Sequence, residues 1–308
     1  MKRILIASRG NPDHLASLFR EELPTHEVLT AVPDRGAAAV PYIVVGRPTP
    51  GLIASVPGVE VVLSLNAGIE HLLSSGEVPV GLPIVRLVDD GLADGMADWV
   101  LAHALSWHRN LGLYRDLQAT GEWAPQQEKL ARERIVTVLG AGALGGPITE
   151  HFVRFGFNTR VWSRSGRGVA GAESFAAGEL LDAVRNADIL VNLLPSTAAT
   201  ADVINARVIG AMAKGGFVIN GGRGAAIVDA DLIAAFEDGQ LSGAALDVFR
   251  TEPLPPGHPF WRHPKIMISP HVAAPTHAHT AVKEMAENIR RHERGEALRH
   301  VVDRSLGY

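Results

Sequence analysis

The chain has 308 residues, of which 46% are hydrophobic and 20% are charged, and this composition is typical of a globular protein. Its formal net charge is −4 and it has no long basic run, so the sequence does not favour binding to nucleic acid or to an anionic membrane surface. The absence of Cys excludes disulfides, thiolate nucleophiles and cysteine metal ligands.

The length of the chain predicts two domains. No apolar run approaches the length of a membrane span, and the apolar run at residues 4–7 is too short for a signal peptide. We therefore expect a soluble cytoplasmic protein.

Short apolar runs alternate with helix-like segments in the first part of the chain. Asn11, Pro12 and Asp13 predict the start of a helix that continues to about residue 22, because Pro is favoured in a first helical turn. Strands are predicted at residues 3–8, 28–32, 42–45, 59–65 and 84–88. Strands joined by such crossovers predict a parallel sheet with helices on its faces.

Beyond residue 93, large apolar residues recur at helical spacing and predict one long helix over residues 94–120. Trp99 and Trp107 lie on its repeating face. Two interpretations stay open: the face packs against the chain's own sheet, or it forms a dimer interface, where large aromatic residues are enriched. Trp123 follows this helix, and the sequence does not decide whether it reaches the site of a neighbouring subunit.

A glycine motif opens a second series of strands and helices. The apolar run Ile135–Leu139 is followed by Gly140, Gly142 and Gly145 in the spacing G-x-G-x-x-G, and then by a helical segment to about residue 155. The first glycine permits a tight turn, the second lets a pyrophosphate approach the backbone, and the third lets helix and strand pack closely. We therefore predict a dinucleotide site, with Ala143 and Leu144 at the helix N-terminus. The alternative is a glycine-rich turn without a ligand.

The second series continues with strands at residues 159–163, 189–193, 216–220, 243–248 and 266–269, and with helices at 145–155, 179–186, 206–212 and 229–237. A last helix, residues 275–293, lies past the final strand, so we expect it to return to the first domain. The expected organisation is a discontinuous domain of residues 1–93 and 275–308, and a dinucleotide-binding domain of residues 94–274.

The second strand of this series ends in a segment that indicates which dinucleotide binds. A NAD-type site carries Asp or Glu there to accept hydrogen bonds from the ribose 2′-hydroxyl, whereas this chain has Ser163, Arg164, Ser165 and Arg167. Arginine pairs with a 2′-phosphate. We therefore predict NADP(H) rather than NAD(H), and the alternative is a solvated basic loop.

Three residues at or beyond predicted strand ends have the chemistry that carbonyl reduction needs, because ligands of open α/β sheets bind there. Arg223 binds a carboxylate in two-pronged fashion. His271 supplies a proton near neutral pH, and Glu252 favours the imidazolium and orients its ring. Asp247 ends its strand and serves either the structure or the cofactor. The closely spaced His277 and His279 belong to no metal motif, so we expect no metal site.

Eight ordered stretches resemble the D-isomer-specific 2-hydroxyacid dehydrogenases, and within them the glyoxylate/hydroxypyruvate reductase A branch. They are SLNAGIEHLL at 64–73, GLADGMADWVL at 91–101, VLGAGALGGPI at 138–148, VWSRS at 161–165, NLLPST at 192–197, NGGRGAAIVD at 220–229, ALDVFRTEPLP at 245–255 and HPKIMISPHVAA at 263–274. The resemblance implies two doubly wound parallel-sheet domains of the α/β class, a flavodoxin-like substrate domain and a Rossmann-type NADP-binding domain, with the active site in the cleft. It also implies a homodimer.

The resemblance assigns roles by position. Arg223, Glu252 and His271 match the catalytic Arg, Glu and His of the family, and Arg223 and His271 also contact substrate. The loop whose amides hold the substrate carboxylate matches Asn66, Ala67, Gly68 and Ile69. Residues matching the cofactor contacts are Leu194, Pro195, Thr200, Gly221, Gly222 and Asp247, the last of them near the nicotinamide amide.

Some positions depart from the branch. Asn66 and Glu70 stand where Gly and Asp are common, and Gly222 replaces an Ala. Arg47 follows Gly46 where the branch often has a bulky aromatic residue and a His. Arg47 either favours a substrate with a second negative or polar group or is a solvated loop residue.

These patterns predict an NADPH-dependent reductase of small 2-oxo acids, with glyoxylate and hydroxypyruvate as leading substrates. The substrate carboxylate is expected to bind the amides of Gly68 and Ile69 and the side chain of Arg223, and His271 protonates the oxygen. Two alternatives stay open: a dehydrogenase of the same family with a larger 2-oxo acid substrate, and a non-catalytic NAD(P)-sensing regulatory protein.

Overall fold

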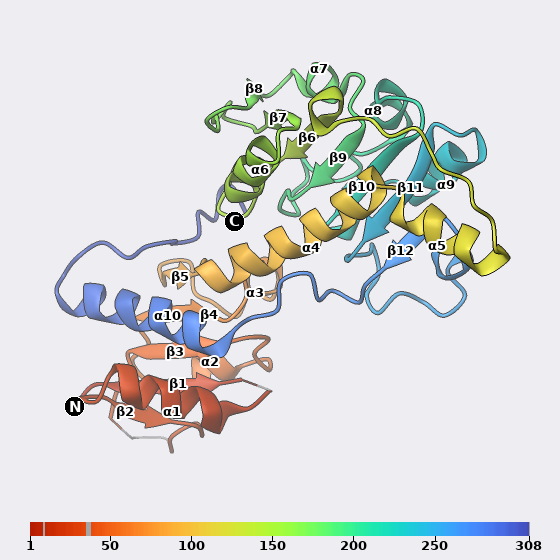
Figure 1. Cartoon of the computed structure of the whole chain (residues 1–308). Helices are drawn as coiled ribbons and strands as arrows, with labels where there is room; N and C mark the ends of the chain where they lie inside the picture. Colours follow the sequence, from red (N-terminus) through yellow and green to blue (C-terminus); the bar gives the residue numbers. More distant parts are fainter. Residues whose placement is uncertain (9, 35–37, 308) are drawn as a thin grey trace. The chain divides into compact units, whose positions relative to one another are not determined.

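Two parallel sheets organise the chain, which is described here from a computed structural model for residues 1–8, 10–34 and 38–307 (Figure 1). The chain divides into two units: unit 1 comprises Met1–Leu92 and Thr276–Tyr308, and unit 2 comprises Ala93–Pro275. Each unit has helices around its sheet, so the predicted α/β class with two parallel sheets is confirmed.

Unit 1 contains a sheet in the order β2-β1-β3-β4-β5, which is the flavodoxin-like order 2-1-3-4-5. Its strands are β1 Arg3–Ala7, β2 Glu27–Leu29, β3 Tyr42–Val45, β4 Val61–Ser64 and β5 Ile84–Val85. Its helices are α1 Pro12–Glu22, α2 Leu52–Ser55, α3 Glu70–Ser74 and α10 Ala278–Glu293. The central strands β3 and β4 are buried along their whole length, as expected for parallel strands covered on both faces. The short helices α2 and α3 were not predicted.

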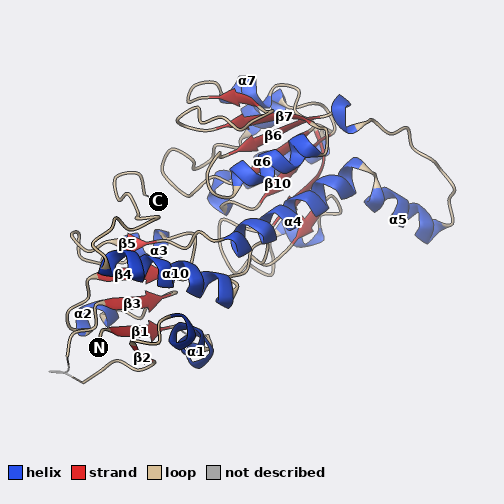
Figure 2. Ribbon diagram, turned by 60° about the vertical axis from the view of Figure 1, so that its left-hand side comes forward, coloured by secondary structure: helices blue, strands red, loops and turns tan. Residues whose placement is uncertain are grey.

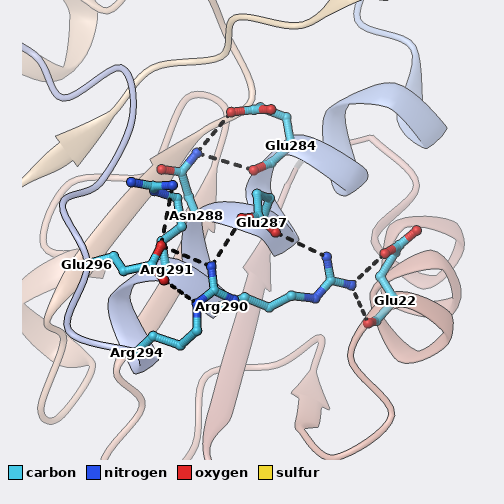
Figure 3. Close-up of polar contacts among 8 residues, drawn as sticks. All are labelled: Glu22, Glu284, Glu287, Asn288, Arg290, Arg291, Arg294 and Glu296. Atoms are coloured by element: carbon cyan, nitrogen blue, oxygen red, sulfur yellow. Dashed lines mark hydrogen bonds and ion pairs between the residues drawn. The ribbon is translucent and has the colours of Figure 1, made fainter.

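The end of the chain completes unit 1. In α10, Val282, Met285 and Ile289 are buried, and Arg290 reaches α1, where its Nη2 lies 2.7 Å from the Glu22 carboxylate (Figure 3). An exposed ion pair contributes roughly 0–1 kcal/mol, whereas burying each large apolar side chain contributes about 1.5–3 kcal/mol. Apolar packing therefore holds α10 in this unit more strongly than the ion pairs drawn in Figure 3.

Unit 2 contains a parallel sheet in the order β12-β11-β10-β9-β6-β7-β8. Its strands are β6 Ile135–Leu139, β7 Asn158–Trp162, β8 Glu173–Phe175, β9 Ile189–Asn192, β10 Gly216–Asn220, β11 Leu241–Leu246 and β12 Ile266–Ile268. Its helices are α5 Leu111–Thr120, α6 Gly145–Arg154, α7 Leu180–Val184, α8 Ala206–Ala211 and α9 Asp229–Glu237, and α4 Asp90–His108 enters it across the boundary. The strand order reverses between β6 and β9, and ligands of such sheets bind beyond the strand ends at this switch point.

Alternating side chains of the unit 2 sheet form two cores. In β9, Leu190 belongs to one core, and Ile189 and Val191 belong to the other, because successive side chains of a strand point to opposite faces. Helices α4 and α6 cover the second of these faces (Figure 2). The short strand β8 at the sheet edge was not predicted from the sequence.

The prediction of one helix over residues 94–120 is wrong, because the chain forms α4 and α5 with a break between them. Asn110 has φ 54° and ψ 29°, which is the left-handed conformation that interrupts a right-handed helix. Asn adopts this conformation more readily than most residues, because its short side chain forms local hydrogen bonds. Periodicity alone did not reveal the break, since the apolar spacing continues through it.

The two tryptophans of α4 decide between the interpretations of its aromatic face. Trp107 Nε1 donates to Ser242 Oγ at 2.8 Å, and its ring stacks on Phe217 at 5.6 Å between centroids. Trp99 Nε1 donates to Ser269 Oγ at 3.2 Å. Helix α4 therefore packs against the sheet of unit 2, whereas α5 buries none of its residues.

Among the described residues, no helix has both the length and the apolar character needed to cross a membrane. No group of three or more His, Asp or Glu side chains in the same residues is placed to hold a metal ion.

Candidate active site

The glycine turn between β6 and α6 has one position that is too crowded for a side chain and another that is open to a ligand. A Cβ added to Gly145 would lie 1.8 Å from the carbonyl oxygen of Gly140, so only glycine permits this close approach of helix and strand. A Cβ added to Gly142 would meet nothing within 4 Å, so the backbone there stays open to a ligand. Ala143 and Leu144 lead from this turn into α6, whose first N–H groups attract phosphate.

The end of β7 lies beside this turn, because the Gly140 N–H donates to the Trp162 carbonyl at 2.8 Å. The next residues form a tight turn, closed by the Gly166 N–H and the Ser163 carbonyl at 3.1 Å. Arg164, Ser165 and Arg167 are exposed on it.

Ser163 Oγ is buried and has no hydrogen-bond partner among the residues that the structure describes. Leaving such a group unpaired costs about 1–3 kcal/mol, and a ligand oxygen would remove this cost. The open Gly142 backbone and the unpartnered Ser163 hydroxyl fit a dinucleotide, and the adjacent arginines fit one that carries an additional phosphate.

Two buried asparagines, which the sequence analysis missed, shape the loops after β9 and β10. Asn192 Nδ2 donates to Asn220 Oδ1 at 2.9 Å, and the Leu194 N–H donates to Asn192 Oδ1 at 3.3 Å. Both asparagines are fully buried. A polar residue that ends an otherwise apolar strand is the signal that would have identified each of them.

Thr200 shapes the rest of the loop that follows Leu194. Its hydroxyl donates to the Pro195 carbonyl at 2.6 Å and accepts the Thr197 N–H at 2.9 Å. The side chain of Thr200 therefore holds the fold of this loop, which lies at the switch point of the sheet.

The backbone of Arg223 is held at the end of β10 by Asn220, one of these two asparagines. Asn220 Nδ2 donates to the Arg223 carbonyl at 3.1 Å, and the Gly222 N–H donates to Asn220 Oδ1 at 3.2 Å. A Cβ added to Gly222 would lie 2.9 Å from the Leu194 carbonyl oxygen, and one added to Gly221 would lie 2.7 Å from Met96 Sδ. The closeness of the loops after β9 and β10 therefore explains why this chain has glycine before Arg223.

His271 and Glu252 form an ion pair at the same edge of the sheet. His271 Nδ1 lies 2.7 Å from Glu252 Oε2, and Glu252 Oε1 accepts the Phe249 N–H at 2.9 Å. The contact of this carboxylate with Nδ1 fixes the orientation of the imidazole ring. Strands β10, β11 and β12 are neighbours, so unit 2 brings the predicted Arg, Glu and His to one edge.

Asp247 is buried, and its carboxylate binds the segment on both sides of His271. Oδ1 accepts Ser269 Oγ at 2.6 Å and the Val272 N–H at 2.9 Å, while Oδ2 accepts the Ala273 N–H at 2.9 Å. His271 has φ 56°, a left-handed conformation that a non-glycine residue keeps only when its surroundings enforce it. The hydrogen bonds of Asp247 provide that enforcement, a role for which the sequence offered no signal beyond the position of Asp247 at a strand end.

The predicted carboxylate loop lies in unit 1, after β4. Asn66 is fixed there by its N–H, which donates to Ser64 Oγ at 3.1 Å, and by its carbonyl, which accepts the Leu87 N–H at 3.2 Å. Ala67 and Gly68 are partly exposed, and Ile69 is buried. The loop therefore starts from a fixed residue, and its accessible part is Ala67 and Gly68.

Comparison with known families and structures agrees with this geometry. Residues 101–273 match the family model described as "D-isomer specific 2-hydroxyacid dehydrogenase, NAD binding domain". The chain is 39% identical to glyoxylate/hydroxypyruvate reductase A of Serratia proteamaculans over 309 aligned residues, which cover 97% of each protein.

Two solved structures are similar over the whole chain. An NADPH-dependent glyoxylate/hydroxypyruvate reductase from Sinorhizobium meliloti, in complex with NADP and sulfate, has a TM-score of 0.93 at 32% identity and covers 100% of both chains. A D-isomer specific 2-hydroxyacid dehydrogenase from Xanthobacter autotrophicus, in complex with NADPH and MES, has a TM-score of 0.93 at 31% identity, covering 100% of this chain and 99% of that one.

Proposed function

The chain belongs to the D-isomer-specific 2-hydroxyacid dehydrogenase family, and from this we propose that it reduces small 2-oxo acids to 2-hydroxy acids with NADPH. Glyoxylate and hydroxypyruvate are the leading substrates, because the Serratia proteamaculans relative bears the name of a reductase of both. The observation that carries the proposal is the 2.7 Å pair of His271 and Glu252, on the same sheet edge as Arg223. A protein that only senses a nucleotide has no need of a proton donor.

We assign the cofactor to the glycine turn and to the loops after β7, β9 and β10. The backbone of Gly140, Gly142 and Gly145 and the start of α6 would hold its pyrophosphate. The 2′-phosphate would pair with Ser163, Arg164, Ser165 and Arg167, which include the buried hydroxyl that lacks a partner among the described residues. The remaining contacts are assigned to Ala143, Leu144, Leu194, Pro195, Thr200, Gly221 and Gly222, whereas Asp247 is assigned to positioning the segment that carries His271. When bound, the reduced cofactor supplies the hydride.

Arg223 and His271 are assigned to the substrate. The guanidinium of Arg223 binds the carboxylate and polarises the adjacent carbonyl, and the backbone amides of Ala67, Gly68 and Ile69 in unit 1 are further carboxylate donors. The imidazolium of His271 donates a proton from Nε2 to the oxygen as negative charge develops on it. Glu252 keeps the ring oriented and stabilises its charge before the proton leaves.

Steady-state kinetics with a panel of 2-oxo acids, each with NADPH and with NADH, test this function. General acid catalysis contributes roughly 10²- to 10⁴-fold, so we expect His271→Gln to lose at least about 10²-fold in kcat and still to bind NADPH. His263→Gln is the matched control, because His263 precedes β12 whereas His271 follows it. NADPH binding without turnover of any 2-oxo acid would instead indicate a regulatory protein, and turnover restricted to larger 2-oxo acids would indicate another dehydrogenase of the family.

We also propose that the protein is a homodimer and that α5 and residues 121–130 contribute to its interface. Four large side chains are exposed there: Leu111 is 55% exposed, Leu113 42%, Trp123 98% and Leu130 51%. Large apolar and aromatic side chains of this kind are enriched in protein interfaces. Light scattering coupled to gel filtration should give a dimer mass for the wild type and a smaller mass for a Leu113→Glu, Trp123→Ser double variant, and a wild-type monomer would contradict the proposal.

A further inference from the structure

Arg47 lies on the same edge of the unit 1 sheet as the carboxylate loop. Strands β3 and β4 are parallel neighbours, with Val45 paired to Ser64 at their ends. Arg47 follows the end of β3 by two residues, and the loop of residues 66–69 follows the end of β4. Parallel neighbours end at one edge, so the side chain of Arg47 and the amides of the loop start from adjacent positions.

Direct hydrogen bonds join the two loops. The carbonyl oxygen of Gly46, the residue bonded to Arg47, accepts His71 Nε2–H at 2.7 Å and Asn66 Nδ2 at 3.3 Å. Asn66 and His71 lie on either side of residues 67–69 in the sequence. The peptide group that links Gly46 to Arg47 is therefore held by hydrogen bonds from residues on both sides of the carboxylate loop.

The loop that carries Arg47 has a restricted conformation. Pro48 follows Arg47 directly, and the residue before a proline is confined to extended backbone conformations. Further along, the Gly51 N–H donates to Glu77 Oε2 at 2.7 Å, and the Leu52 N–H donates to the Thr49 carbonyl at 3.1 Å. The position from which the long side chain of Arg47 extends is thus set by the fold.

Other arginines of unit 1 are bound to neighbouring groups, whereas Arg47 is exposed. Arg3 pairs with Glu27, Arg290 pairs with Glu22, and Arg304 donates to backbone carbonyls. Within the described residues Arg47 makes no hydrogen bond or ion pair. Its guanidinium therefore stays available for a ligand.

We propose that Arg47 binds a second carboxylate of the substrate, so that the enzyme prefers 2-oxo dicarboxylic acids to 2-oxo monocarboxylic acids of the same length. This inference rests on the proposed function, because it assumes that the loop of residues 66–69 holds the carboxylate next to the reacting carbonyl. If the loop holds the carboxylate next to the carbonyl, the other end of a short substrate lies near the guanidinium of Arg47. A second carboxylate at that end of the substrate would then pair with Arg47. A planar guanidinium binds a carboxylate through two parallel hydrogen bonds.

The test compares kcat/KM, with NADPH, for oxaloacetate and 2-oxobutyrate, which have four carbons each and differ in the second carboxylate. Loss of a charge-assisted contact costs roughly 10- to 150-fold in affinity. We therefore expect Arg47→Gln to lower the ratio of kcat/KM for oxaloacetate to kcat/KM for 2-oxobutyrate by about that factor. Most of the change should be a rise in KM for oxaloacetate. Arg47→Lys, which keeps the charge but not the two-pronged geometry, is expected to give an intermediate ratio.

Lys2→Gln is the matched control, because Lys2 directly precedes β1 at the opposite edge of the same sheet. We expect it to leave the ratio at the wild-type value. If the wild type reduces glyoxylate but Arg47→Gln keeps the wild-type ratio, this inference is wrong and the proposed function stands. If the wild type reduces no 2-oxo acid, both are wrong.

Discussion

Replacement of Asp247 by Asn tests whether this residue positions the segment that carries His271. The two side chains have nearly the same shape, so the exchange changes hydrogen bonding and charge but not volume. The carboxylate of Asp247 accepts hydrogen bonds from Ser269 Oγ, the Val272 N–H and the Ala273 N–H. An amide keeps one acceptor oxygen and places an NH₂ group where the other oxygen was.

The magnitude follows from these three contacts. If the amide oxygen keeps Ser269 and Val272, which share Oδ1, its NH₂ faces the N–H of Ala273, which is then unpaired in a buried position. Such an unpaired donor costs about 1–3 kcal/mol. If the same free energy is lost from the positioning of His271 in the transition state, kcat falls roughly 5- to 150-fold, because about 1.4 kcal/mol corresponds to tenfold in rate.

Two measurements separate positioning from a direct cofactor contact. Steady-state kinetics should show the fall in kcat, and fluorescence titration should give a Kd for NADPH close to that of the wild type. Asp188→Asn is the matched control, because Asp188 is also buried and also binds a backbone N–H, that of Ile135, but directly precedes β9 rather than following a strand. Urea unfolding should show a similar loss of stability in both variants, with kcat reduced only in Asp247→Asn.

Three results would refute this reasoning. Wild-type kcat in Asp247→Asn would show that the contacts around His271 do not matter for turnover. An equal fall of kcat in Asp188→Asn would show that general destabilisation is sufficient. A large rise in the Kd for NADPH with unchanged kcat would instead place Asp247 at the cofactor.

Two further predictions concern the cofactor and stability. Arg164→Asp should lower the preference for NADPH over NADH by roughly 10- to 150-fold, because a charge-assisted pairing with the 2′-phosphate is replaced by repulsion. The measurement is kcat/KM for each cofactor. An unchanged preference would exclude Arg164 from the phosphate site. Burial, followed by the nearby Arg134, lowers the pKa of His108 below its ordinary value of 6.5, so the folded protein takes up a proton at this site less readily than the unfolded chain. The stability from this site is therefore present above about pH 6.5 and is lost as the pH falls below it. His108→Asn keeps an acceptor for Arg134 Nε. In urea titrations this variant should show a shallower fall of the unfolding free energy between about pH 7 and 5 than the wild type. The same slope in both proteins would show that His108 does not cause this pH dependence.

Local patterns were sufficient for most of the strands, for the longer helices α1, α6, α9 and α10, and for the position of the glycine turn. Strands β3, β6 and β9 are short and almost entirely apolar because both faces of a parallel sheet are buried. The left-handed turn at Asn110 and the edge strand β8 escaped prediction. At Asn110 the apolar spacing continues through a change of one backbone conformation, and β8 is largely exposed, so it lacks an apolar pattern.

The sequence by itself determined the chemistry that is available: the spacing of three glycines, two arginines in place of an acidic residue after β7, and an Arg, a Glu and a His after successive strands. Only the tertiary structure decided which of these groups meet and what holds them. Three sets of contacts illustrate this, and each joins residues that are at least 20 positions apart in the sequence. They are the Asn192–Asn220 pair, the contacts of Asp247 around His271, and the hydrogen bonds from Asn66 and His71 to the carbonyl of Gly46. Such contacts depend on strand order and register, which arise when distant strands pair and bury their side chains together.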